Sequence, residues 1–569
     1  MELIEENIQR VSDYIGNQKF KTLANLFSEL NTLDDVVALC LAKLLVDSKK
    51  INSTYVVTFN SNSVTQNPEI INFCNQMNII LLNLDIEEDV QSMYSIICKN
   101  FSSKDCSGKE SYASDLLKLK NDTVRGILYT LALRTNGIVL SNINKSNLQI
   151  GNYTKTSQKV GDWNIIGNLT SKQIIDIAKG FNISQYFFDK YIEDINYHDQ
   201  KFGIPYESFF DEKGEMLNFN ILSSKSQKYI RDNEHKKVYP PIPTNELNEV
   251  RKLNVSDGSD NSDKSYEIDD VYSNKDIYES QYELPQQLSD VLKELRQKEQ
   301  FSAKKWLDDV LLTLSREFAE DNIEYVVFGL SGGVDSATVA SIMNELNKIY
   351  PLKKIIAVAL PCSSTKEIQE RAFEVANDMN ITCMTVDLTT VHINLCNKIY
   401  KLLNLTEEEI VRHQFVDGCF KSSLRANILY CISRLIKNTV VIGTGNKSED
   451  KYLGYCAKSG DNMVDKSPIG TLYKRYVYFL GKLLGVSKSI LNAQPSADLV
   501  PNQTDEGELS MSYEFVELYM RLLEMKKNEM EQIISSFDES TLSTFREMET
   551  NIVSIHERNK HKSVLGQVI

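Results

Sequence analysis

The sequence predicts an α/β protein made of two tandem Rossmann-like domains, each with a doubly wound parallel sheet, and three observations lead to this prediction. Short apolar runs typical of buried strands alternate with amphipathic segments typical of helices. A glycine-rich turn joins one strand to one helix in the second half of the chain. The same series of motifs occurs twice, about 300 residues apart.

The elements of the second half follow the order that a doubly wound sheet requires. An amphipathic helix comes first, because apolar residues between Trp306 and Phe318 recur at three- and four-residue spacing. Strands and helices then alternate. They are the strand Tyr325–Gly329, the helix Ala337–Leu346, the strand Ile355–Leu360, the helix Lys366–Met379, the strand Thr382–Val386 and a strand within Asn438–Gly445.

The first half repeats the second in a nearly constant register. The matched pairs are Arg125 with Arg425, Lys145 with Lys447, Lys155 with Lys458 and Lys172 with Lys474, at offsets of 300, 302, 303 and 302 residues. The apolar run Tyr55–Phe59 matches Ile355–Ala359 at a similar offset. Two unrelated domains would not keep one register through so many motifs, so the chain is predicted to be an internal duplication.

The duplication divides the chain of 569 residues into three parts. Copy one, a degenerate domain, is predicted over residues 1–245, and copy two, the active domain, over residues 291–569. Residues 246–290 between them are polar and acidic, which is typical of a solvated linker.

The composition is that of an ordinary globular protein, with 42% hydrophobic and 25% charged residues. A net charge of −15 disfavours a general nucleic-acid-binding protein. The longest apolar stretch, Val36–Val46, is short and is interrupted by Lys43, so no membrane span is expected. The start of the chain is acidic and polar and shows no targeting signal. Ten cysteines without close pairs suit free thiols in the cytoplasm.

The strongest local signal in copy two is the hexapeptide SGGVDS, Ser331–Ser336, between a predicted strand and a predicted helix. Its two glycines allow close approach of the backbone, and N–H groups at a helix N-terminus attract an anion. Ser331 and Ser336 add hydroxyl donors, and Asp335 is a candidate Mg²⁺ ligand. The ending of a Walker loop is missing. A simple left-handed turn is the alternative, but the complete hexapeptide in this position favours anion binding.

This hexapeptide resembles the pyrophosphate loop of the ATP pyrophosphatase superfamily, whose domains have the adenine nucleotide alpha hydrolase-like fold. Further motifs occur in a fixed order, and these are RANILY, GTGNKSE (Gly443–Glu449), GYCAKSGD (Gly454–Asp461), SPIGTLYK (Ser467–Lys474), PSADL (Pro495–Leu499), QTDEGEL (Gln503–Leu509) and NKHK near the C-terminus. With this series, residues 303–562 resemble the ammonia-dependent NAD synthetases.

The resemblance implies an ATP-dependent ligase of NAD biosynthesis. The nicotinate carboxylate of deamido-NAD would attack the α-phosphate of ATP and release pyrophosphate, and ammonia would then displace AMP from the acyl adenylate. The implied partners are these small molecules and Mg²⁺, without nucleic acid or membrane. Two alternatives stay open: another amidotransferase-type ligase of the same superfamily, and a catalytically decayed dinucleotide-binding or regulatory protein.

The resemblance also implies roles for individual residues. Ser331, Asp335 and Lys474 are the implied catalytic residues, and Asp335 with Glu449 forms the implied metal site. The implied ATP-binding residues are Ser331, Gly332, Gly333, Val334, Asp335, Ser336, Thr444, Lys474 and Ser496. The implied deamido-NAD-binding residues are Arg425, Lys458, Asp465, His561 and Lys562 of copy two, with Arg125, Lys155, His235 and Lys236 of copy one.

Many NAD synthetases carry an N-terminal glutaminase of the nitrilase type, but here copy one occupies that part of the chain. The enzyme is therefore expected to use free ammonia as nitrogen donor, unless a separate subunit provides the ammonia.

Copy one has lost the motifs that would serve its own ATP. In place of SGGVDS it has LNTLDD, Leu30–Asp35, and Asn142 and Asn147 replace Thr444 and Glu449. When the two Gly-Asp pairs are aligned, Ile166 corresponds to Asp465. Copy one is therefore not expected to bind Mg·ATP.

The losses are selective, because Arg125, Lys155, His235 and Lys236 persist. In NAD synthetases, residues of these types reach the dinucleotide bound in the partner subunit of a dimer. We therefore expect a covalent pseudo-dimer with one working site, completed by copy one. Pairing of two chains through their second copies remains an alternative, and the retained Lys172 does not fit the hypothesis.

Overall fold

The computed structural model describes the secondary structure of most of both copies. The described residues are 25–28, 30, 32–47, 52–59, 67–100, 109–150, 161–202, 204–211, 215–217, 222–233, 277–500, 503–562 and 567–568.

The two copies contain sheets of the same topology. In copy one, β1 (Asn25–Ser28), β2 (Ser53–Thr58), β3 (Ile80–Asn83) and β4 (Gly137–Val139) are parallel in the order β3-β2-β1-β4. In copy two, β6 (Tyr325–Gly329), β7 (Lys354–Ala359), β8 (Thr382–Thr385) and β9 (Thr439–Val441) are parallel in the order β8-β7-β6-β9. The predicted fold class, two doubly wound parallel sheets, is confirmed.

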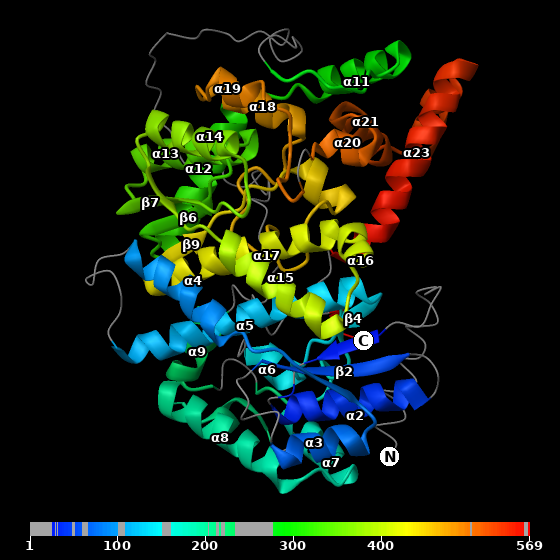
Figure 1. Ribbon diagram of the computed structural model, residues 1–569. Helices are drawn as coiled ribbons and strands as arrows, with labels where there is room; N and C mark the ends of the chain where they lie inside the picture. Colours follow the sequence, from blue (N-terminus) through cyan, green and yellow to red (C-terminus); the bar gives the residue numbers. More distant parts are fainter. Residues whose placement is uncertain are drawn as a thin grey trace.

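Helices pack on both faces of each sheet (Figure 1). The elements of copy one are α2 (Leu33–Asp47), α3 (Pro68–Gln76), α4 (Glu87–Lys99), α5 (Lys109–Arg134), α6 (Lys145–Ile150), β5 (Trp163–Asn164), α7 (Ser171–Gly180), α8 (Gln185–Phe202), η1 (Tyr206–Phe209) and α9 (Ser224–Asn233). The first elements of copy two are α11 (Gln286–Glu299), α12 (Ala303–Glu320), α13 (Val334–Ile349), α14 (Lys366–Asp378), α15 (Thr389–Leu403), α16 (Glu407–Arg412), α17 (Gln414–Leu435) and the π-helical η5 (Lys447–Leu453). The remaining elements are α18 (Lys474–Leu483), α19 (Lys488–Leu491), α20 (Asp505–Leu509), α21 (Tyr513–Leu523), α22 (Lys527–Ser535), α23 (Glu539–Asn559), η6 (Lys560–Lys562) and β10 (Gln567–Val568).

Helix α12 shows how the sequence sets a boundary. Ser302 caps the helix by accepting a hydrogen bond from the backbone N–H of Lys305 at 3.3 Å. The apolar stripe predicted from spacing is buried against the sheet, including Leu314 and Phe318. In the described part of the chain, no helix is long and apolar enough to cross a bilayer.

Helix α5 of copy one packs against helix α17 of copy two, and this pair of long helices joins the copies (Figure 1). The helices are antiparallel, since the middle of α5 contacts the end of α17 and the end of α5 contacts its start. Gly126 permits close packing, because a Cβ atom there would lie 3.1 Å from Cβ of Ser423. One hydrophobic core runs through the interface and includes Leu128 of copy one and Phe420 of copy two.

Ion pairs at both ends fix the register of this helix pair. Arg134 donates to Asp417 at 2.5 Å, and Arg434 donates to Asp122 at 2.7 Å. Asp122 is 1% exposed, so the second pair is largely shielded from water.

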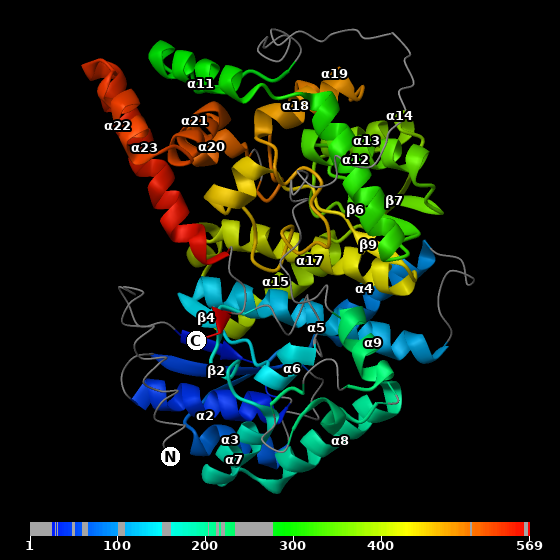
Figure 2. The same ribbon diagram turned by 180° about the vertical axis from the view of Figure 1, so that it is seen from behind.

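Two further segments connect the parts of the chain. Strand β10 pairs in parallel with β5, with Gln567 opposite Trp163, so the end of copy two lies on copy one (Figure 2). Residues 277–284, which the sequence placed in the linker, pack on copy two through Tyr278, whose ring lies 4.8 Å from that of Tyr478.

Replacing Asp122 by alanine should weaken the interface between the copies. The change leaves the Arg434 guanidinium without its carboxylate partner at a largely buried position, so we expect a loss of about 3 kcal/mol in the free energy of unfolding. Urea denaturation measures this loss. As a control, Glu345→Ala removes an exposed pair with Lys348 and should cost no more than about 0.5 kcal/mol. Equal losses in the two variants would contradict the prediction.

Candidate active site

The SGGVDS loop connects the end of β6 to the start of α13. Gly332 has a φ of 79°, and a Cβ atom there would lie 2.7 Å from the carbonyl oxygen of Ile368, so only glycine fits. The Ser331 and Ser336 hydroxyl oxygens lie 3.1 Å apart, and Ser336 Oγ accepts from the N–H of Ser331 at 3.2 Å. The loop thus presents two hydroxyls at the N-terminus of a helix of 16 residues, an arrangement suited to phosphate.

A charged cluster lies at the first turn of α13. The buried Lys474 ammonium donates to Asp335 Oδ2 at 2.5 Å and to Glu449 Oε1 at 2.7 Å. Asn446 donates to the other oxygen of Asp335 at 2.9 Å. Three segments, α13, η5 and α18, therefore bring together the residues for which the sequence predicted catalysis and metal binding.

Four residues of this cluster, Asn446, Asp450, Asp505 and Tyr513, were not assigned roles from the sequence. The Tyr513 hydroxyl lies 2.8 Å from Glu449 Oε1 and 3.0 Å from Asp505 Oδ2. Asp505 also accepts a hydrogen bond from the N–H of Ala497 at 3.1 Å. Asp505 stands within the QTDEGEL motif, which was a signal, whereas Tyr513 lies outside every motif and only the fold places it here.

Burial dominates the electrostatics of the cluster. It raises the pKa of Asp335, although Lys474 opposes this effect. It also raises the pKa of Asp505 to about 7 and that of Asp450 well above its usual range. Burial alone would lower the pKa of Lys474, but Asp335 and Glu449 outweigh it and the pKa rises.

The donor set fits a divalent cation completed by phosphate. The cluster holds four carboxylates, those of Asp335, Glu449, Asp450 and Asp505, around one ammonium group, and their mutual repulsion favours an added cation. No three His, Cys, Asp or Glu side chains among the described residues are grouped closely enough to hold a metal ion alone. Mg²⁺ commonly binds through one or two carboxylates and substrate phosphates, so this set suits Mg²⁺ carried with ATP.

The other residues predicted to bind ATP lie around this cluster. Val334 is the first, buried residue of α13, and Thr444 is half-buried in the turn after β9. Ser496 is exposed in the PSADL loop and accepts a hydrogen bond from the N–H of Asp498 at 3.2 Å. Their contacts with ATP remain predictions.

Copy one contains a version of the same cluster with fewer charged groups. Asp34 and Asn144 occupy the positions of Asp335 and Asn446, and Asn144 donates to both oxygens of Asp34 at 2.9 and 3.1 Å. Asn147 replaces Glu449 and accepts from the Tyr206 hydroxyl at 3.0 Å. Copy one thus keeps the arrangement of the cluster but has no carboxylate at the position of Glu449.

The structure corrects the partner of Lys474 in copy one. The N–H of Lys474 donates to Ser448 Oγ at 3.1 Å, and the N–H of Ser171 donates to Ser146 Oγ at 3.1 Å. Both residues begin their helices, α18 and α7. Ser171 is therefore the counterpart of Lys474, and the exposed Lys172, matched from the sequence, is one residue out of register.

The start of α2 explains why copy one is unsuited to phosphate. The N–H of Thr32 donates to Asp35 Oδ2 at 2.8 Å, and the N–H of Asp35 donates to Thr32 Oγ1 at 3.2 Å. This reciprocal cap uses the helix N–H of Asp35 and puts a carboxylate where copy two has Ser336. A phosphate would meet a like charge there.

The structure also corrects the counterpart of Asp465. Asp465 Oδ2 accepts from the N–H of Val441 at 2.9 Å, and Asp162 Oδ2 accepts from the N–H of Val139 at 2.8 Å. Asp162 therefore corresponds to Asp465, and the alignment with Ile166 was wrong because the Gly-Asp pairs at 161–162 and 460–461 are not equivalent positions. Copy one has kept this carboxylate.

Comparison with known proteins agrees with this geometry. The family model described as NAD synthase matches residues 3–209 and 306–565, one segment in each copy. The chain belongs to the NAD synthase family.

Among the relatives, an NH(3)-dependent NAD(+) synthetase of Alkaliphilus oremlandii is 33% identical over 215 residues, which cover 38% of this chain and 84% of that protein. One of Methanococcoides burtonii is 38% identical over 196 residues, covering 34% of this chain and 70% of that protein. A solved structure of NMN synthetase from Francisella tularensis is 27% identical with a TM-score of 0.39, and it covers 47% of this chain and 99% of that chain.

The residues predicted to bind the dinucleotide lie in several neighbourhoods of this NAD synthase. Arg425 donates to the carbonyl of Leu360 at 3.2 Å and lies 3.3 Å from Asp498. The buried Arg125 donates to the carbonyl of Leu140 at 3.0 Å. Asp465 accepts from the Tyr430 hydroxyl at 3.2 Å in copy two. Lys458 forms an ion pair with Asp162 of copy one, and Lys562 Nζ donates to the carbonyl of Gly454 at 3.1 Å.

Lys155, His235 and Lys236 lie outside the described residues, and so does the side chain of His561. The dinucleotide contacts of all nine residues remain predictions.

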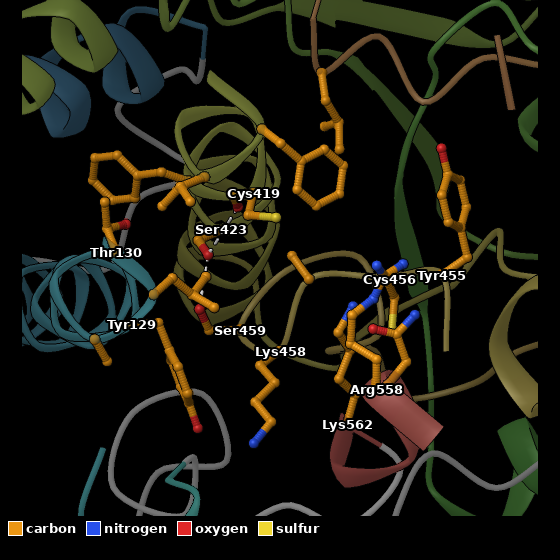
Figure 3. A pocket seen from close by; sticks show the side chains of 18 of the residues that line it. Tyr129, Thr130, Cys419, Ser423, Tyr455, Cys456, Lys458, Ser459, Arg558 and Lys562 are labelled. Atoms are coloured by element: carbon orange, nitrogen blue, oxygen red, sulfur yellow. Dashed lines mark hydrogen bonds between the residues drawn. The ribbon is translucent and has the colours of Figure 1, made fainter. Parts of the chain in front are cut away.

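A cavity of about 1270 Å³ lies between the copies. Its walls come from α5, β4 and β5 of copy one and from α17, the loop 455–461 and the segment 555–562 of copy two. Lys458 and Lys562 both line it, and Tyr129 lies beside Lys458, whose Nζ is 5.7 Å from the centre of the tyrosine ring (Figure 3). The charged cluster at Asp335 is not part of its lining.

Asp34 should make copy one less stable as the pH rises. Burial raises its pKa to about 7, above the value of 3.8 for an exposed carboxyl. The folded chain then holds a proton that the unfolded chain releases, so stability falls between about pH 4 and pH 7. Asp34→Asn removes this pH-dependent loss of stability. The melting temperature of the variant minus that of the wild type should therefore rise between about pH 4 and pH 7. Thermal unfolding at pH 5 and pH 8 tests this, and a constant difference would contradict it.

Proposed function

We propose that the chain catalyses ATP-dependent amidation of deamido-NAD to NAD, with ammonia as nitrogen donor and AMP and pyrophosphate as products. The observation that carries the proposal is the pairing of the SGGVDS loop with the Asp335–Lys474–Glu449 cluster in copy two. The family and the names of the relatives agree with it.

The proposed mechanism depends on positioning and charge. Ser331, Ser336 and the N–H groups at the start of α13 would bind the phosphates of ATP. Asp335 and Glu449 would hold Mg²⁺, which neutralises phosphate charge when bound. Lys474 would then turn from these carboxylates to a phosphate oxygen and stabilise the charge that grows as pyrophosphate leaves.

The proposed mechanism uses no protein nucleophile. The carboxylate of deamido-NAD is the nucleophile in this proposal, and it must approach the α-phosphate against electrostatic repulsion. The cations of the site reduce that repulsion, and fixed orientation lowers the barrier further. An adenylate held away from water would react with ammonia before hydrolysis.

The proposed domain organisation is copy one at 1–245, a linker at 246–290 and copy two at 291–569, and copy one completes the dinucleotide site near Asp465. The last part of the linker, from residue 277, packs on copy two and belongs to it structurally. Lys172 no longer opposes this hypothesis, because Ser171 occupies the ATP-type position. We infer a cytoplasmic location, where the free thiols of the described cysteines stay reduced. Measurement of the mass in solution shows whether two chains pair further.

The test is formation of AMP and NAD from deamido-NAD and ATP, with ammonia or glutamine as donor. We expect turnover with ammonia and little with glutamine. Asp335→Asn should lower kcat at least about 100-fold, because it removes a charge that acts on the reacting phosphates. Asp34→Asn is the matched control in copy one and should retain turnover. Absence of AMP under every condition would refute the proposal, and equal losses in both variants would refute the assignment of catalysis to copy two.

A further inference from the structure

The cavity between the copies touches copy one at the residue that corresponds to Asp465. Its copy-one wall consists of five residues of α5 between Gly126 and Leu133, of Gly137 and Ile138 at the start of β4, and of Asp162 and Trp163. Asp162 accepts a hydrogen bond from an N–H of β4, just as Asp465 accepts one from an N–H of β9. Through Asp162, the cavity therefore includes the position in copy one that Asp465 holds in copy two.

The chemistry of the walls suits a ligand with both phosphate and aromatic rings. Lys458 is 8% exposed, and Lys562 lies close enough to contribute to the lowering of its pKa, after the larger effect of burial. Lys458 is already paired with Asp162, so the charges of Lys562 and Arg558 on the same wall are the ones that favour an anion. Tyr129, Trp163 and Phe415 all line the cavity, and Phe415, which is 41% exposed, has a ring on which a base can stack.

Size narrows the class of ligand. A cavity of about 1270 Å³ is larger than the roughly 300–1,000 Å³ usual for small-molecule sites. It can hold two linked nucleotides, and Asp461 and Glu508 on its wall are acceptors for ribose hydroxyls. The proposed function supplies such molecules, deamido-NAD and NAD, and the inference rests on it to that extent.

A dinucleotide bound there would not react, because copy one's cluster has Ser171 and Asn147 in place of the lysine and second carboxylate. Its helix N-terminus is capped by Asp35. We propose that the cavity between the copies is a second, non-reacting site for a nicotinamide or nicotinate dinucleotide.

The chain carries its own reporter for this site. It has two tryptophans, Trp163 in the cavity wall and Trp306 on α12 in copy two. In a Trp306→Phe background, titration with NAD in the absence of ATP should change Trp163 emission in a saturable manner. Equilibrium dialysis with labelled NAD should find two dinucleotides per chain.

Variants of the cavity cations identify the site. Lys458→Met and, separately, Lys562→Met should abolish the Trp163 response and reduce binding to one dinucleotide per chain. Two lysine variants are used because loss of Lys458 also leaves Asp162 without its ion-pair partner. The matched control is Lys527→Met at an exposed position of α22. This variant should keep the Trp163 response and bind two dinucleotides per chain.

The outcomes separate this inference from the proposed function. Asp335→Asn should lose AMP formation but keep the Trp163 response. An unchanged Trp163 emission with saturating NAD, one dinucleotide per wild-type chain, or a response to ATP and not to NAD would overturn the second site, even if the enzyme makes NAD.

Discussion

The antiparallel packing of α5 on α17 is the contact on which the rest of the molecule depends. It merges the cores of the two copies, and ion pairs at Arg134 and Arg434 fix how far one helix can slide on the other. The glycine at 126 allows the backbones to approach closely enough for this core to exclude water. Because the helices lead directly into β4 and β9, their register also sets which residues of the two copies face each other across the cavity.

The two clusters show how one fold supports two electrostatic states. In copy two, burial of several carboxylates is offset by one ammonium group, and a cation with phosphate would complete the balance. In copy one, Ser171 and Asn147 remove both the ammonium and one carboxylate, and the remaining Asp34 takes up a proton more readily. The Asp35 cap then stabilises the helix start that phosphate would otherwise stabilise. The predicted loss of Mg·ATP binding in copy one would therefore follow from a change of charge and not from a loss of structure.

Much of the active site could be predicted because its residues lie in short, ordered motifs. Ser331, Asp335, Glu449 and Lys474 follow strand or helix ends, where their positions depend on local sequence. The register of the copies was harder to predict, because loops of different length shift it by a few residues. Lys172 looked like the partner of Lys474, yet the hydrogen bonds of the helix starts select Ser171. In the same way, Asp162 and not Ile166 makes the contact of Asp465.

The sequence by itself determined the duplication, the parallel α/β class and the chemistry of the SGGVDS loop, because these depend on periodicity and on residues close together in the chain. Only the tertiary structure decided that Tyr513 joins the charged cluster, that Lys458 of copy two pairs with Asp162 of copy one, and that a cavity lies between the copies. These features depend on contacts between segments far apart in sequence. The packing of α5 on α17 determines the contacts that join the copies, and no local sequence pattern encodes these contacts.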